Sequence, residues 1–292
     1  MEAIISELPL VIFTACVIIG AGGFVALGVA AAADRVEPAE GSRQAFAPVG
    51  GTQAVPLVFL TVVLVGFVAA FFHLASPLHA AFALTGIGRS PMSNEIAMGV
   101  VFTLAAIVVC VLRFAGKLSA GANRVASIVL AVLGLVFVAF TGAAYMMRTI
   151  VTWSTPFSIV ESVGLTLFAG PVLYTALTSL LGGDDVSKRG RMVQFVVAIF
   201  GVIVGFGFLG LHVVWTGSLH SGMTSGSALV GEVAALLAVA FALGMASLLA
   251  CWRLLAGKPS GKAPATAAVV CAAVAIVMAR LVFYGIQLSV GL

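Results

Sequence analysis

The stretch FFHLASPLHAAFALTGIGRSPMSNE, residues 71–95, joins two long apolar runs and decides how the chain is to be interpreted. It holds two of the four histidines, one arginine and one acid, in a protein of which only 8% is charged. Ionisable groups at the edge of a hydrocarbon layer cost free energy, so they are functional candidates in a membrane protein. We therefore expect chemistry at this stretch and a scaffolding role for the rest of the sequence.

The composition predicts an all-α integral membrane protein. The 292 residues are 62% hydrophobic, with a mean hydropathy of +1.24. Soluble domains carry about 25% charged residues, so a water-soluble core could not absorb this much apolar surface. The apolar runs are long and unbroken, whereas a transmembrane barrel shows alternating segments of about ten residues. No basic block with interleaved aromatic residues suggests a nucleic acid partner.

Eight apolar runs are each long enough to cross about 30 Å of hydrocarbon at about 20 residues per helix. Together they predict an eight-helix bundle that forms a single transmembrane domain over residues 1–292. The helices are expected at residues 8–32, 53–75, 93–115, 123–147, 158–181, 191–215, 227–255 and 265–288. The N-terminus, MEAIISELP, has acids but no basic region, so we expect the first run to be retained rather than cleaved as a signal peptide.

The basic residues predict the orientation in the cytoplasmic (inner) membrane. With the N-terminal side called side A, this side carries Arg89 and Arg148, and Arg280 lies toward it in the last helix. The other eleven basic residues fall on side B, namely Arg35, Arg43, Arg113, Lys117, Arg124, Lys188, Arg189, Arg191, Arg253, Lys258 and Lys262. Because basic residues concentrate on the cytoplasmic side, both termini are expected outside.

A weak four-plus-four repeat is a further expectation. The first and fifth predicted helices carry Gly22 and Gly170, and the second and sixth end near His73 and His212. Small residues recur by chance in membrane helices, so a duplication and a coincidence both remain open.

His73 and Glu95 are the candidate proton acceptors. His73 lies near the side A end of the second predicted helix, and Glu95 begins the third. Imidazole, with a pKa of about 6.5, can pass protons at physiological pH, and quinol oxidation releases two protons with two electrons. The structural alternatives are a histidine bonded to a nearby carbonyl and an acid facing the helix dipole, with Ser93 or Ser90 as the N-cap.

Two further polar residues have simpler explanations. The segment from Ser158 to Glu161 fits a capping box, which favours a structural role for Glu161. Arg280 lies in an otherwise apolar helix, so it must snorkel outward or pair with an acid or a ligand oxygen.

The sequence offers few ligands for a resident redox centre. All four cysteines fall inside apolar runs and form no CxxC motif, so we expect no iron–sulfur cluster in this chain. His73 and His212 both lie near side A and could hold at most one haem rather than a stacked transmembrane pair. We expect no haem.

Six short motifs stand in order along nearly the whole chain. They are Pro9-Leu10-Val11-Ile12-Phe13-Thr14 with Gly22-Gly23-Phe24, His73-Leu74-Ala75-Ser76-Pro77, Ser93-Asn94-Glu95-Ile96, Trp153-Ser154-Thr155-Pro156, Gly170-Pro171, and Arg280 followed by Phe283-Tyr284-Gly285. With these motifs the protein resembles the membrane-anchor subunit of dimethyl-sulfoxide-reductase-type molybdoenzymes. Each motif is weak alone, and together they are fairly specific.

The resemblance implies an eight-helix, haem-free subunit that oxidises menaquinol. It also implies two partners, a four-cluster iron–sulfur subunit and a catalytic molybdopterin subunit, of which the latter selects the terminal substrate. In that family the histidine of the HLxSP motif and the glutamate of the SNE motif are associated with the quinol site, which carries over to His73 and Glu95. No motif of the family covers His212, His220 or Glu161.

The sequence therefore predicts a menaquinol-oxidising membrane anchor. His73 and Glu95 accept the protons, and Arg280 orients the head group or pairs with Glu95. A secondary transporter is one alternative, and it would need a polar path near the midplane and interrupted helices. A passive anchor without a quinol site is the other. Electrons tunnel fast only over short gaps, which favours partners docked on side A, although the family also includes cytoplasmic partners and leaves the docking side open.

Overall fold

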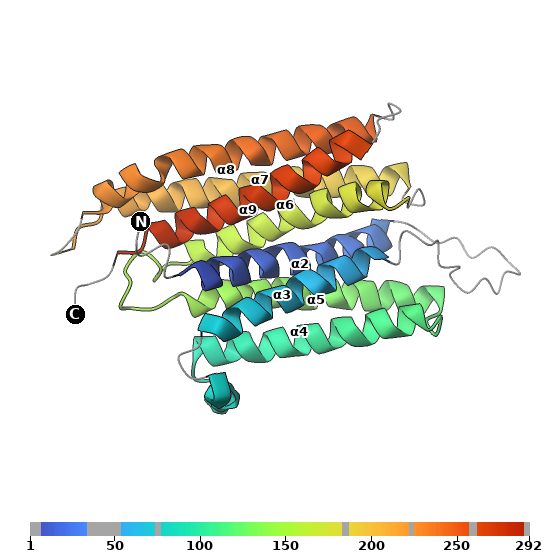
Figure 1. Ribbon diagram of the computed structural model, residues 1–292, viewed down its shortest axis with the longest axis horizontal. Coiled ribbons are helices and arrows are strands. Elements are labelled where there is room, and N and C mark those ends of the chain that lie inside the picture. Colours follow the sequence, from blue (N-terminus) through green and yellow to red (C-terminus); the bar gives the residue numbers. More distant parts are fainter. Residues whose placement is uncertain are drawn as a thin grey trace, which may run out of the picture.

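The computed structural model describes residues 7–33, 54–73, 77–182, 187–221, 225–256 and 262–288, with only the backbone described for 73 and 77–81. The elements in these ranges are α2 (Leu8–Ala33), α3 (Ala54–His73), the 3₁₀ helix η1 (Pro77–Gly86), α4 (Pro91–Phe114), α5 (Ala120–Ala144), α6 (Phe157–Leu180), α7 (Lys188–Gly217), α8 (Gly226–Leu255) and α9 (Lys262–Gly285). The eight α-helices run side by side (Figure 1), and each is long and apolar enough to cross a membrane. The predicted all-α, eight-helix membrane bundle is confirmed.

Serine side chains begin most of the helices after α3. Ser90 is the N-cap of α4, and its hydroxyl accepts from the Ser93 backbone N–H at 3.5 Å. Serines cap α5, α7 and α8 in the same way. Helix α6 is different, because its N-cap is Pro156 and no side-chain hydrogen bond caps it. The predicted capping box is therefore wrong, and Glu161 is free to turn toward the bundle interior.

The bundle has two halves of four helices, α2–α5 and α6–α9 (Figure 1). In each half the first helix contacts the second and the fourth, and the third contacts the fourth. Contacts between the halves come in matched pairs: α2 contacts α7 and α9, and α6 contacts α3 and α5. This arrangement corresponds to a pseudo-two-fold axis between α2 and α6, and it supports the expected repeat.

The two halves meet backbone to backbone where α2 crosses α6. A Cβ atom on Gly170 would overlap the carbonyl oxygen of Gly22, and one on Gly22 would come within 2.9 Å of the Thr166 carbonyl oxygen. Helix α7 packs on α6 with similar closeness, since a Cβ atom on Gly205 would lie 2.5 Å from the Leu165 nitrogen. Small residues thus bring α2, α6 and α7 close together, as in other membrane helix pairs.

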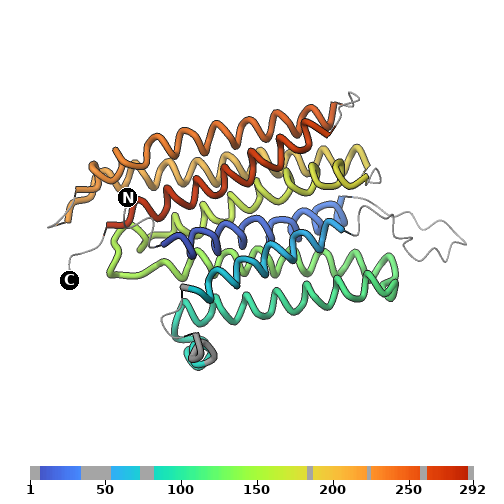
Figure 2. The backbone as a smooth tube through the Cα atoms, viewed as in Figure 1, coloured from blue at the N-terminus to red at the C-terminus, as the bar shows by residue number. Residues whose placement is uncertain are grey.

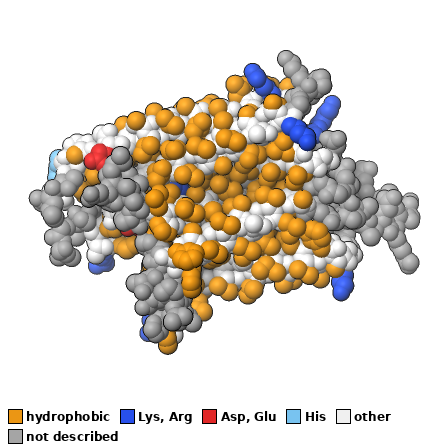
Figure 3. Space-filling view, in the orientation of Figure 1, with side chains coloured by type: hydrophobic (Ala, Val, Ile, Leu, Met, Phe, Trp, Pro, Cys, Tyr) orange, Lys and Arg blue, Asp and Glu red, His pale blue; other side chains and the backbone are white. Residues whose placement is uncertain are grey.

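The surface agrees with a membrane location. Hydrophobic side chains cover the middle of the face shown in Figure 3. Most of the Lys and Arg side chains visible there lie toward the ends, and more of them lie at the right, where α4 ends and α5 begins in Figure 2. That end is side B, because α2 begins and α9 ends at the other. Arg35, Arg43 and Lys258, which contribute to the predicted orientation, lie outside the described residues.

Candidate functional site

The buried side chain of Arg280 is the centre of a polar cluster near side A. It is only 1% exposed, although it stands in the apolar helix α9. Its Nε donates to Thr14 Oγ1 of α2 at 3.0 Å, and its Nη1 lies 3.8 Å from Glu161 Oε1 of α6. The guanidinium carbon lies 4.1 Å from the ring centre of Phe283, in cation–π contact. Of the alternatives predicted for Arg280, pairing with an acid is the one observed.

Glu161 is also bonded to His212 of α7, and both side chains are fully buried. His212 Nδ1 lies 3.1 Å from Glu161 Oε2, and Nε2 lies 2.7 Å from the Thr152 carbonyl oxygen. A carbonyl oxygen can only accept, so Nε2 carries a hydrogen. Without a second proton, Nδ1 and the carboxylate oxygen would both be acceptors. The contact therefore holds one shared proton, as imidazolium beside carboxylate or imidazole beside carboxylic acid.

Aromatic side chains complete this cluster. The hydroxyls of Tyr145, after α5, and Tyr284, in α9, are hydrogen-bonded to each other although 139 positions separate them. The same separation relates His73 to His212, as expected for equivalent positions in the two halves. Trp153 stacks on Phe283 with ring centres 5.3 Å apart, and its Nε1 donates to the Phe283 carbonyl oxygen at 3.2 Å.

Glu95 lies at the edge of the same cluster, in the second turn of α4. Its side chain is 7% exposed, and its Oε1 has no hydrogen-bond partner among the described residues. The carboxyl group lies beside Thr141 of α5 and within electrostatic range of Arg280 and Tyr145. A buried carboxyl oxygen without a partner costs free energy, and such groups occur where a protein accepts a proton or a ligand.

The connection before α4 is anchored to the start of the helix that carries Glu95. Gly88 has a φ of 82°, a conformation that favours glycine, and its N–H donates to Asn94 Oδ1 at 2.7 Å. This bond and the Ser90 cap tie the connection to the first turn of α4. His73 is the last residue of α3, but its side chain lies outside the described part of the structure. Its approach to Glu95 stays a prediction.

An aromatic layer lies below Glu95, toward the bundle centre. One turn along α4, a Cβ atom on Gly99 would come within 2.7 Å of Phe67 and 2.9 Å of Phe137. The Phe67 and Phe137 rings are stacked with centres 6.0 Å apart, and Phe102 lies 5.7 Å from Phe137. These rings close the cluster toward side B with apolar surface.

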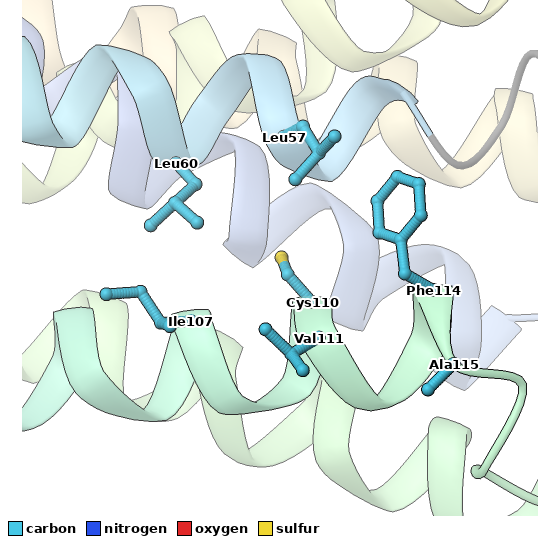
Figure 4. A pocket seen from close by; sticks show the side chains of 7 residues that line it. All are labelled: Leu57, Leu60, Ile107, Cys110, Val111, Phe114 and Ala115. Atoms are coloured by element: carbon cyan, nitrogen blue, oxygen red, sulfur yellow. The ribbon is translucent and has the colours of Figure 1, made fainter.

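Two apolar grooves lie toward side B and are separate from the cluster. Figure 4 shows the groove between α3 and α4, of about 440 Å³, with Leu57 and Leu60 facing Ile107 and Cys110. The other groove, of about 550 Å³, lies between α7 and α8. They occupy equivalent positions in the two halves, and neither is lined by an acid, an arginine or a histidine.

Within the described ranges, no group of three or more His, Cys, Asp or Glu side chains is placed to hold a metal ion. Of the predicted site residues, Glu95 and Arg280 lie in one cluster, and Arg280 forms its ion pair with Glu161 rather than with Glu95. Sequence reasoning missed the pairing of Glu161 with His212. The sequence feature that could have drawn attention to His212 was the repeat, because it makes His212 the counterpart of the candidate site residue His73.

Eight uninterrupted apolar helices and a buried ionisable cluster at one membrane edge define a multi-pass membrane subunit with a polar site. The family model described as "DMSO reductase anchor subunit (DmsC)" matches residues 1–286, and the protein belongs to this family. It is similar to the C subunit of the anaerobic dimethyl sulfoxide reductase of Escherichia coli K12, at 30% identity over 98% of this sequence and 96% of the relative. It is also similar to the anaerobic dimethyl sulfoxide reductase subunit YnfH of that organism, at 28% identity over 78% of this sequence and 79% of the relative.

Proposed function

We propose that this protein is the membrane anchor and menaquinol-oxidising subunit of a molybdopterin oxidoreductase complex in anaerobic respiration. The observation that carries the proposal is the buried Oε1 of Glu95, which has no hydrogen-bond partner among the described side chains and lies within electrostatic range of Arg280. A quinol hydroxyl donates a hydrogen bond, and it would satisfy this oxygen at the moment when a proton acceptor is needed. General-base groups must lie within hydrogen-bond reach of the proton that they take.

In the proposed reaction, menaquinol enters from the lipid between helices near side A. Its two hydroxyl protons pass to Glu95 and His73, and its two electrons pass to an iron–sulfur cluster of the partner, which leaves menaquinone. Arg280, held by Thr14 and Glu161, faces the head group with positive charge. The aromatic layer below Glu95 blocks a path toward side B, so the protons leave toward side A.

The proposed partners are a four-cluster iron–sulfur subunit and a molybdopterin catalytic subunit. Two relatives are named as parts of anaerobic dimethyl sulfoxide reductases, which supports an assembly of this type. The catalytic subunit would select the terminal substrate. Because the candidate quinol groups lie near side A and tunnelling distances are short, docking on side A fits the proposal best.

A secondary transporter is the first alternative. Transporter sites lie near the midplane and use broken helices, whereas the eight described helices are continuous and the cluster lies at one edge. A passive anchor is the second alternative, and it predicts that no residue of the cluster affects electron transfer from quinol.

The Glu95→Gln and His73→Ala variants of the assembled complex test the proposal. We expect each to slow reduction of the iron–sulfur clusters by a menaquinol analogue about 100-fold, the lower range for loss of a general base. The control is Glu232→Gln, which changes an exposed acid near side A in the other half. Wild-type rates in both site variants, with intact complexes, would support the passive anchor instead.

The proposed orientation has its own test. Arg148, near side A, and Lys117, on side B, are both exposed. In intact spheroplasts, a membrane-impermeant maleimide should label Arg148→Cys directly and Lys117→Cys only after lysis. Labelling in the opposite order would place the termini in the cytoplasm and reverse the proposed orientation.

A further inference from the structure

The Glu161–His212 pair neither donates nor accepts a proton in the reaction proposed above, but Glu161 contacts Arg280 of the candidate site. Both residues are fully buried, and both belong to the half of the bundle that does not contain Glu95. Among the described side chains, Arg280 links them to the candidate quinol site, because it is 3.8 Å from Glu161 and within electrostatic range of Glu95. Buried polar groups of this kind act over longer distances than in water, because the local dielectric is low.

The hydrogen bonds fix the charge of this group. The Thr152 carbonyl requires a hydrogen on Nε2 of His212, and the contact of Nδ1 with Glu161 requires one shared proton. With that proton, the pair has no net charge wherever the proton lies. Arg280 then contributes a positive charge that the pair does not cancel. Among the side chains that the structure describes around Arg280, the carboxylate of Glu95 is placed to balance it.

We propose that Glu161 and His212 are positioning residues that set the charge at the quinol site. The proton that they share keeps Arg280 electrically uncompensated, so Arg280 favours the carboxylate form of Glu95, the form that accepts a proton from quinol. This proposal rests on the proposed quinol oxidation at Glu95. It assigns the second half of the bundle a role in chemistry that takes place in the first half.

The titratable groups around the cluster are limited among the described side chains. Glu95 lies within electrostatic range of Arg280 of α9 and of Tyr145 after α5. Tyr145 is bonded to Tyr284 of α9, and α2 contributes the neutral Thr14. Helix α6 contributes Glu161, and α7 contributes His212. The side chains of His73 and His79, on α3 and η1, lie outside the described part of the structure.

Three variants separate the charge of the pair from its shape, because one of them changes the net charge and two of them keep it. In His212→Gln, Glu161 remains a carboxylate beside Arg280, and the positive charge near Glu95 is cancelled. In Glu161→Gln, a neutral His212 accepts from the new amide, and the charge is the same as in the wild type. In the double variant Glu161→Gln/His212→Gln, both residues are neutral, and Arg280 is again uncompensated.

The test measures menaquinol oxidation by the intact complex as a function of pH, together with pH-dependent binding of a menaquinol analogue. Losing a nearby positive charge makes Glu95 hold its proton more tightly, so the acid limb of the rate profile should move to higher pH by about one unit in His212→Gln. Glu161→Gln and the double variant should keep the wild-type midpoint. The shift in the single variant and its reversal in the double variant together separate charge from packing.

The proposal would be overturned if the acid limb of His212→Gln had the same pH midpoint as the wild type. It would also be overturned if the acid limb of the double variant remained shifted to higher pH. If His212→Gln does not assemble, Glu161→Gln decides alone. If Glu161 and His212 of the wild type do not share a proton, this variant removes a negative charge, and the acid limb of the rate profile should move to lower pH by about one unit. Failure of the proposed function is seen separately, because Glu95→Gln would then oxidise quinol at the wild-type rate.

Discussion

Replacing Gly170 with alanine is expected to prevent the two halves of the bundle from packing. The new methyl group would overlap the Gly22 carbonyl oxygen, which is backbone and cannot rotate away. Overpacking of a tight core costs 1–3 kcal/mol and sometimes more, so we expect a loss of about 3 kcal/mol. The measurement is the amount of protein that remains folded after detergent extraction, together with its Tm.

Gly207→Ala is the matched control for this prediction. Gly207 is also inside a helix, but nothing described lies within 4 Å of the Cβ atom that alanine would add. Alanine is favoured over glycine in a helix by up to about 1 kcal/mol, so this variant should be at least as stable as the wild type. Equal stability of the Gly170 and Gly207 variants would contradict the backbone contact between α2 and α6.

Replacing Glu161 with leucine is expected to have a comparably large effect. The change removes the acid partner of Arg280. It also leaves Nδ1 of the fully buried His212 without the hydrogen-bond partner that Glu161 provides. Removing one partner of a buried ion pair costs about 3–5 kcal/mol. We expect little folded protein to accumulate in the membrane.

Glu161→Gln separates shape and hydrogen bonding from charge at the same position. Its amide oxygen can accept from Arg280, and its amide nitrogen can donate to His212, so this variant should fold. Accumulation measured by immunoblot and Tm measured on the extracted protein give the comparison. If the leucine variant is as stable as the glutamine variant, the buried contacts of Glu161 do not hold α6, α7 and α9 together.

The sequence predicts the helices well because the membrane imposes a simple rule. A segment that crosses about 30 Å of hydrocarbon must satisfy its backbone internally, so long apolar runs become helices. The Ser90 cap and the pairing of Arg280 with an acid also follow from local chemistry. Each of these predictions depends on a residue and its immediate surroundings.

The arrangement of the helices does not follow from the sequence in the same way. Apolar residues face both lipid and protein in a membrane helix, so the pattern does not distinguish the two faces. In α7, Val213 is 4% exposed and Val214 is 73% exposed, although the side chains are identical. The partner of His212 therefore depended on how α6 and α7 pack, and a local capping pattern gave the wrong expectation for Glu161.

The direct backbone contact between Gly22 and Gly170 limits how this protein can work. Proteins built from two repeats often carry solutes by rocking one repeat against the other, which opens a central site alternately to each side. Here no layer of adjustable side chains separates α2 from α6 at their crossing, and the Tyr145–Tyr284 bond joins the halves again near side A. Rocking of one half against the other is therefore not the means by which the proposed quinol site would open to its ligand.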